Sequence, residues 1–271
     1  MQSLHISTSA LRGVQQALDN TANNLANVDT VGFKRRSASF SELLSDSMNE
    51  QAAVDNQQRN SPAGLRIGSG ARLGLTKMDV TPGSMKVTDV PTDLMIEGDG
   101  YFMVSRVFRN ADGEMEDEYR LTRSGGFQLT QMGDLPGFAL ATPTGEYLVD
   151  EVGNRITFEN PGELTITPEG VVMMDGVEAA QLRLFKVDNP DQLQQVGNNQ
   201  LLAPTLGDQK APDFMDYAEG RIRQGALESS NVNLQEEMSQ LINIQRAYQL
   251  NSRAIGITDQ MMGIANSLRS R

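Results

Sequence analysis

Carboxylates form the densest groups of reactive side chains in this sequence. The larger group surrounds a predicted hairpin turn, and a smaller pair, Glu97 and Asp99, flanks Gly98. A calcium site needs ligands at alternating loop positions and a closing bidentate carboxylate, and neither group has that spacing. We therefore interpret both as solvated loop ends and expect no metal site. The larger group consists of Asp112, Glu114, Glu116, Asp117 and Glu118.

The sequence also lacks a complete set of residues for covalent catalysis. His5 is the only histidine and the chain has no cysteine, so a Ser-His-Asp or Cys-His arrangement lacks its parts. A glycosidase needs two suitably separated carboxylates; residue type leaves that open, but nothing marks a pair. The glycines of residues 62–70 lack the Gly-Lys-Ser/Thr ending of a phosphate-binding loop, and no G-x-G-x-x-G pattern occurs there. We expect no catalytic residue and no cofactor.

Composition limits the partners and the compartment. The formal net charge of −12 argues against nucleic acid, because phosphate binding needs a positive field and residues 34–36 are the only basic cluster. No run approaches the roughly 18 apolar residues of a membrane span. The first twenty residues contain polar side chains where a cleaved signal peptide would be apolar. Taken alone, this pattern indicates a cytoplasmic protein.

Two segments of the chain have a heptad repeat and are predicted to be long helices. The first is a predicted helix from residue 2 to about residue 28. The second is the helix to which the chain is predicted to return from Gly225, and it runs to the end. Residues 228–231 are predicted to cap the second helix, and Glu236 and Glu237 suit its dipole. Each repeat predicts a narrow apolar seam for another helix. The seam positions are Leu4, Leu11, Val14, Leu18, Leu25, Leu234, Leu241, Tyr248, Ile255 and Met262.

The first helix is predicted to stop at a polar turn. Asp29 and Thr30 have side chains that hydrogen-bond their own backbone outside a helix. Gly32 can adopt a positive φ, so the chain can change direction there. Phe33 then supplies an apolar anchor beyond the turn.

The segments between the helices predict two further regions. Residues 37–74 are rich in Ser, Asn, Gln and Gly, and this composition predicts a polar linker with a long loop. Residues 75–225 contain short β-like runs separated by glycine turns, which predicts a central β domain with a return segment. The predicted fold class is α+β, with residues 1–36 and 226–271 paired as a coiled-coil-like assembly domain.

Motifs at both ends resemble those of a known family. The segment of residues 23–34, NNLANVDTVGFK, resembles the N-terminal signature of the flagellar rod and hook proteins of bacteria, the axial family. Residues 98–102 and 122–127 resemble the paired motifs of the β body of that family, and residues 225–234 with 245–248 resemble its C-terminal signature. The motif residues carried over are Asn23, Asn24, Asn27, Thr30, Gly32, Phe33, Ser230, Asn231, Arg246 and Tyr248.

The resemblance implies a structural role rather than catalysis. It implies a rod subunit that polymerises with itself into a hollow helical drive shaft, with the terminal helices as inner wall and flagellar proteins passing through the lumen. It implies neighbouring rod and hook proteins as partners and export by the flagellar type III apparatus without a cleaved signal peptide. This places the chain outside the cytoplasm, in the basal body, and on this point we follow the family.

Alternatives remain within and outside the family. The long polar loop between residues 45 and 63 most resembles that of distal-rod members, while a hook or proximal-rod subunit is the alternative within the family. A secreted carbohydrate-acting enzyme with helical termini is the alternative from another class. That enzyme would need a converging pair of acids in a cleft.

Overall fold

The computed structural model describes residues 2–42, 45–47, 66–68, 71–109, 115–132, 137–204 and 211–269. The chain divides into two compact units. Residues 1–26, 36–77 and 233–271 form the first, called here the helical unit, and residues 27–35 and 78–232 form the second, called the β unit. The expected α+β class, with a helix at each end and a β-rich centre, is confirmed. No helix in the described part of the chain is long and apolar enough to cross a membrane.

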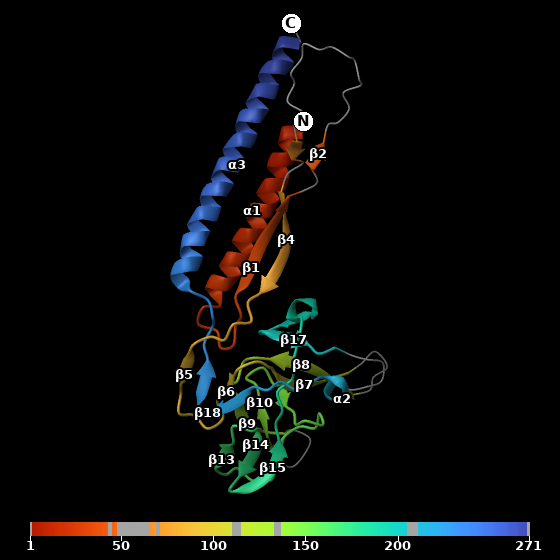
Figure 1. Cartoon of the computed structure of the whole chain (residues 1–271), viewed down its shortest axis with the longest axis vertical. Helices are drawn as coiled ribbons and strands as arrows, with labels where there is room; N and C mark the ends of the chain where they lie inside the picture. The colour runs from red at the N-terminus through yellow and green to blue at the C-terminus, as the bar shows by residue number, and fades with distance from the viewer. Residues whose placement is uncertain are drawn as a thin grey trace, which may run out of the picture. The chain divides into compact units, whose positions relative to one another are not determined.

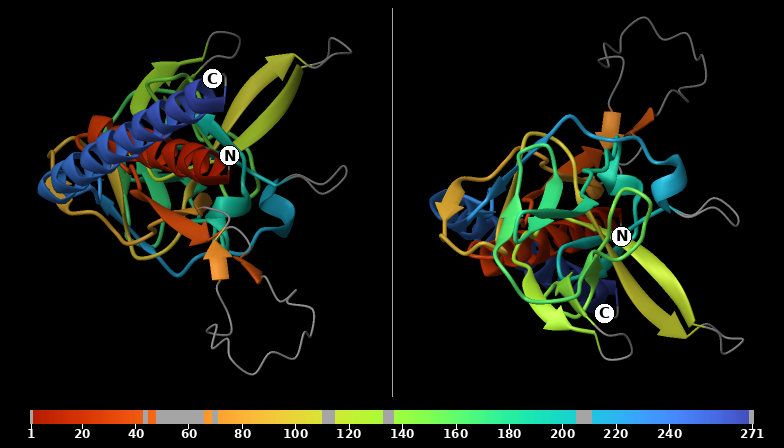
Figure 2. Two further views of the ribbon diagram at one scale, coloured as in Figure 1. Left: turned by 90° about the horizontal axis from the view of Figure 1, so that it is seen from above. Right: turned by 90° about the horizontal axis from the view of Figure 1, so that it is seen from below.

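The helical unit contains two long helices and two short strand pairs. Helix α1 spans Gln2–Ala26 and helix α3 spans Leu234–Arg269, and they lie alongside each other in opposite directions (Figures 1 and 2). Strand β1 (Arg36–Glu42) pairs with β4 (Ala71–Met78). Strand β2 (Ser45–Ser47) pairs with β3 (Arg66–Gly68).

Part of the segment expected to be a linker is therefore β-structured. The reason is visible in β1, where Ala38 and Phe40 alternate with serines, the period-2 pattern of a strand. Most of the long loop between residues 45 and 63 lies outside the described residues, as do residues 62–65 and 69–70 of the glycine-containing stretch 62–70.

The β unit is built around a sheet with the strand order β12-β10-β11-β7-β8-β17-β16, in which β9 also pairs with β10. The strands of this sheet are β7 (Phe102–Arg109), β8 (Met115–Thr122), β9 (Gln128–Gln131), β10 (Phe138–Ala141), β11 (Tyr147–Leu148), β12 (Thr157–Phe158), β16 (Gln195–Gly197) and β17 (Gln200–Leu202). A second, three-stranded sheet consists of β13 (Leu164–Ile166), β14 (Val171–Met174) and β15 (Val177–Gln181).

Two strand pairs and two short helices complete the described part of the β unit. Strand β6 (Leu94–Glu97) pairs with β18 (Arg221–Gln224), and β5 (Met85–Val87) pairs with β19 (Ala226–Glu228). The β19 pairing brings the returning chain beside a segment that left the helical unit about 140 residues earlier. The short helices are η1 (Pro190–Gln192) and α2 (Ala211–Phe214).

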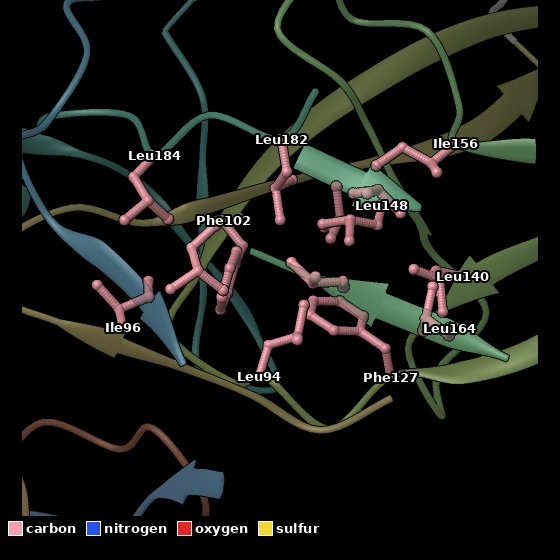
Figure 3. Close-up of a cluster of buried hydrophobic side chains, with 14 of the residues drawn as sticks. Leu94, Ile96, Phe102, Phe127, Leu140, Leu148, Ile156, Leu164, Leu182 and Leu184 are labelled. Carbon is pink, nitrogen blue, oxygen red and sulfur yellow. The ribbon is translucent and has the colours of Figure 1, made fainter. Parts of the chain in front are cut away.

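Strand β7 contributes to two separate cores, because successive side chains of a strand point to opposite faces. Phe102 and Val104 lie in the larger apolar cluster, where the Phe102 ring packs edge-to-face on Phe127 with centroids 5.4 Å apart (Figure 3). Tyr101 and Met103 lie in the second cluster, and Met103 is fully buried. Both faces of this strand are therefore covered.

The turn that precedes Phe127 requires glycine at one of its two glycine positions. The Gly125 carbonyl accepts a hydrogen bond from the Leu94 amide at 2.9 Å, so the two backbones are in contact. A Cβ on Gly125 would lie 1.6 Å from the carbonyl oxygen of Leu94, whereas a Cβ on Gly126 would meet nothing within 4 Å. The absence of a side chain at Gly125 thus permits the close approach of the Leu94 backbone. No such close contact requires glycine at position 126.

This difference gives a test of the turn. Gly125→Ala should destabilise the fold by about 2–3 kcal/mol or more, because the added methyl group forces two backbones apart. Gly126→Ala is the matched control and should change stability by less than about 1 kcal/mol. Urea unfolding of both variants measures the difference; equal stability of the two variants would contradict this description of the turn.

Candidate functional site

The polar turn after α1 is part of the β unit and is held by its backbone. Thr30 donates from its amide to the Asn27 carbonyl at 3.2 Å and from its hydroxyl to the Asn27 side-chain oxygen at 3.1 Å. Gly32 has φ of 67°, and a Cβ there would lie 2.5 Å from the carbonyl carbon of Arg123. The Gly32 amide donates to the Glu228 carbonyl at 2.8 Å. Glycine at this position thus satisfies both the sign of φ and the lack of space.

Beside this turn, one carboxylate compensates two buried cations. The Nζ of Lys34 lies 2.6 Å from Oε1 of Glu228, and Nη1 of Arg123 lies 3.3 Å from Oε2. The Gly83 amide also donates to Oε1, at 2.9 Å. The three charged side chains are 4% or less exposed. We call Lys34, Arg123 and Glu228 the Glu228 cluster.

The Glu228 cluster carries a formal charge of +1 and uses backbone carbonyls to stabilise its cations. Lys34 donates to the Thr81 carbonyl at 2.8 Å, and Arg123 donates to the Gly98 carbonyl at 3.0 Å while its guanidinium lies over the Tyr101 ring. Burial lowers the pKa of Lys34 below its usual 10.5, although the hydrogen bond and charge of Glu228 act in the opposite direction. The cations therefore depend on this single anion.

Asn231, three residues after Glu228, makes a second set of hydrogen bonds to the chain near Lys34 and Thr81. Its side-chain oxygen accepts from the Arg35 amide at 2.6 Å, and its side-chain nitrogen donates to the carbonyls of Asp79 and Thr81 at 2.9 and 3.0 Å. The segment before β5 and the segment before α3 thus share one amide side chain. Asn231 is engaged here and does not cap the helix.

The cap of α3 differs from the one expected at residues 228–231. Asn233 is the capping residue, since its side-chain oxygen accepts from the Gln235 amide at 3.0 Å and the Glu236 amide at 3.4 Å. The residues expected to cap are used elsewhere: Glu228 is in the buried cluster, and the Ser230 hydroxyl accepts from the Val232 amide.

Within the helical unit, Asn24 joins the end of α1 to two neighbours. Its nitrogen donates to the Arg36 carbonyl at 2.9 Å and to Glu237 at 3.3 Å, and its oxygen accepts from the Arg36 amide at 3.0 Å. Asn20 also donates to the Arg36 carbonyl, at 3.0 Å. Glu237, expected only to favour the helix dipole, is fully buried at this contact. Asn23, also in the family motif, is exposed.

The buried face of α1 is not the predicted leucine seam. Its buried residues are small or polar and recur every three or four positions, which allows a close approach of the neighbouring backbone. The predicted seam residues lie beside this face. Those that the structure describes are half-buried and so keep accessible apolar surface, whereas the Leu4 side chain lies outside the described residues. The buried residues are Gly13, Ala17, Thr21 and Asn24, and the half-buried seam residues are Leu11, Val14, Leu18 and Leu25.

Helix α3 carries three stripes about 120° apart, as a turn of 100° per residue shows. The inner stripe is buried or half-buried, and consists of Glu237, Leu241, Ile244, Ala247, Asn251, Ile255 and Thr258. The outer stripe is apolar and 56–71% exposed, and consists of Leu250, Ile257, Met261, Ile264 and Leu268. Met238 and Ile242 are each 49% exposed and lie on the side of the polar stripe. The polar stripe is exposed, and consists of Gln245, Gln249, Ser252, Gly256, Asp259 and Gly263.

The predicted seam of α3 is therefore divided in the structure. Leu241 and Ile255 lie in the inner stripe, whereas Leu234, Tyr248 and Met262 are 39–44% exposed at its edges. The sequence signal for the outer stripe was the spacing of residues 257, 261, 264 and 268, which repeats every three or four positions out of register with the seam.

The candidate chemical residues give no converging site. In the described residues no group of three or more His, Cys, Asp or Glu side chains could hold a metal ion. Asp117 pairs with Arg155 on the surface, and Glu97 pairs with Arg223 at 3.1 Å. Asp112 and Glu114 lie outside the described residues, as does the His5 side chain.

The comparisons with known proteins agree at both ends and over the whole length. A family model described as flagella basal body rod protein matches residues 4–34, and one described as flagellar basal body rod FlgEFG protein C-terminal matches residues 223–268. The chain is 32% identical to the flagellar basal-body rod protein FlgG of Borreliella burgdorferi, over 99% of each chain. It is 31% identical to FlgG of Caulobacter vibrioides over 100% of each. It is 30% identical to the flagellar hook-basal body complex protein FlhP of Bacillus subtilis, over 99% of this chain and 100% of that one.

The Glu228 cluster predicts an order of mutational effects. Glu228→Gln should lower the free energy of unfolding by about 3–5 kcal/mol, because it leaves Lys34 and Arg123 buried without an anion. Lys34→Met should cost less, since one cation then remains paired with Glu228. Glu97→Gln removes an exposed partner of Arg223 and should cost less than about 1 kcal/mol. Urea unfolding at neutral pH ranks the three; a mild Glu228→Gln effect would contradict the role given to its charge.

Proposed function

The chain belongs to the flagellar basal-body rod protein family and is a structural subunit of that rod, and from this premise we propose that it polymerises with copies of itself through α1 and α3. The outer stripe of α3 is the observation that carries the proposal. It is an apolar surface on a helix whose inner stripe already faces its own unit. Exposed apolar surface of this extent marks an interaction site.

The three stripes of α3 suit a helix in the wall of a tube. The inner stripe pairs with α1 as a coiled-coil-like unit, and the outer stripe meets the helices of a neighbouring copy. The polar stripe, which includes Gln245, Ser252 and Asp259, then faces an aqueous channel. A head-to-tail contact that does not close on itself propagates as a helical filament. The half-buried seam of α1 supplies further apolar surface for the neighbour.

The distribution of charge supports contacts through the helical unit. The β unit contains 27 acidic and 13 basic side chains, a net charge of −14, whereas the helical unit contains 8 and 10, a net charge of +2. Like-charged bodies repel one another. Copies therefore associate best through their nearly neutral helices, with the acidic β units apart.

The names of the relatives bear on which part of the rod or hook this subunit forms. Several are FlgG rod proteins, which favours a distal-rod subunit, while FlhP is named as a hook-basal body complex protein and keeps a hook or proximal-rod role as the alternative. The proposed partners are neighbouring rod and hook proteins and the type III export apparatus. The proposed route is export from the cytoplasm to the basal body without a cleaved signal peptide. No relative named above is named as an enzyme, which favours a purely structural role.

One pair of neighbouring residues tests the outer stripe. Leu250→Asp should leave the helix content unchanged but raise the critical concentration for polymerisation at least about 100-fold, because a charge in an apolar contact costs several kcal/mol. Gln249→Asp introduces the same charge one residue away, on the polar stripe, and should assemble normally. Sedimentation and electron microscopy of both proteins measure the effect. Normal filaments from Leu250→Asp would remove the outer stripe from the interface.

A further inference from the structure

We propose that Met261 of α3 makes assembly sensitive to oxidation, an inference that rests on the proposed function. Met261 is 58% exposed in the outer stripe. The other exposed methionines of α3 lie on other sides of the helix: Met238, 49% exposed, is on the side of the polar stripe, and Met262, 39% exposed, is in line with the inner stripe. Methionines in the cores are shielded from solvent, since Met103 is fully buried and Met95 is 7% exposed. The Met261 thioether is thus placed on the surface that a second copy must cover.

The chemistry needs only a peroxide. The thioether sulfur attacks one oxygen of hydrogen peroxide, the O–O bond breaks, an S=O bond forms, and the remaining oxygen leaves as water. Sulfur loses two electrons and the peroxide gains them. The product is a polar sulfoxide in place of a flexible apolar side chain, and access to solvent governs which methionines react.

A sulfoxide in the outer stripe would be buried without a partner. The nearest stripe residues to Met261 are Ile257 and Ile264, which offer no side-chain donor. The nearest arginine on this side, Arg253, lies eight residues from Met261, about two helical turns along the axis. Burying an unpaired polar group is unfavourable, so oxidation opposes docking of the second copy.

The same geometry implies that assembly in turn protects the sulfur. Once a second copy covers the outer stripe, peroxide reaches Met261 only in subunits that dissociate. Assembly therefore protects Met261 from oxidation, and oxidation keeps free subunits from assembling. Met85, 43% exposed on β5 of the β unit, lies on no α3 stripe and serves as an exposed comparison.

Peptide mass spectrometry of the full chain tests the protection. In free subunits exposed to hydrogen peroxide, Met238, Met261 and Met85 should form sulfoxide while Met103 does not. In polymer, sulfoxide formation at Met261, measured relative to Met85, should fall at least about tenfold. Equal relative rates in subunit and polymer would overturn the proposal.

Polymerisation assays test the consequence. After peroxide treatment the critical concentration of the natural chain should rise at least about tenfold, and methionine sulfoxide reductases should restore it. The variant Met261→Leu keeps apolar bulk in the outer stripe without an oxidisable sulfur and should assemble before and after treatment alike. If the treated variant also fails to assemble, or the treated natural chain assembles normally, the proposal is wrong. Failure of the untreated natural chain to polymerise under any condition would instead refute the proposed function.

Discussion

A single carboxylate, on Glu228, compensates the charges of Lys34 and Arg123 inside the β unit. Its backbone carbonyl also receives the Gly32 amide. Gly32 and Lys34 belong to the turn after α1, Arg123 belongs to the turn after β8, and Glu228 itself lies on β19, the last strand before α3. The chain just after α1 and the chain just before α3 are therefore joined inside the β unit, and Asn231 joins them again with a second set of hydrogen bonds. Removing one partner from such a buried ion pair is strongly destabilising, which makes this junction sensitive to mutation.

Helix α3 is the other element on which function depends. A helix in a self-contained globular unit usually has one apolar face, whereas α3 has two, separated by a polar stripe. Its own unit covers only the inner one. In the assembly proposed above, the outer stripe is the surface that a second copy completes, and the near-neutral charge of the helical unit favours that approach over one between acidic β units.

The sequence was sufficient to predict the two terminal helices and the central β region, but not the contacts between residues far apart in the chain. Heptad spacing located both helices, with α1 ending at Ala26 rather than near residue 28, because the turn bonds of Asn27 and Thr30 begin earlier. Lys34 looked like part of a basic cluster and Glu228 like a capping residue. They are 194 positions apart, and no periodicity relates residues at that distance. The heptad repeat of α3 likewise predicted one narrow seam where the structure has two apolar stripes, because a partner's position decides which side of a helix is covered.

Strand β7 links the two cores of the β unit, with Phe102 and Val104 in one and Tyr101 and Met103 in the other. Neither core can melt without exposing the opposite face of the same strand, so the two should lose structure in one cooperative transition. Under mechanical load, such a unit should therefore yield in one step rather than in stages. In a rotating shaft it would transmit shear as one body up to a single yield point, which is the behaviour that a stiff coupling requires.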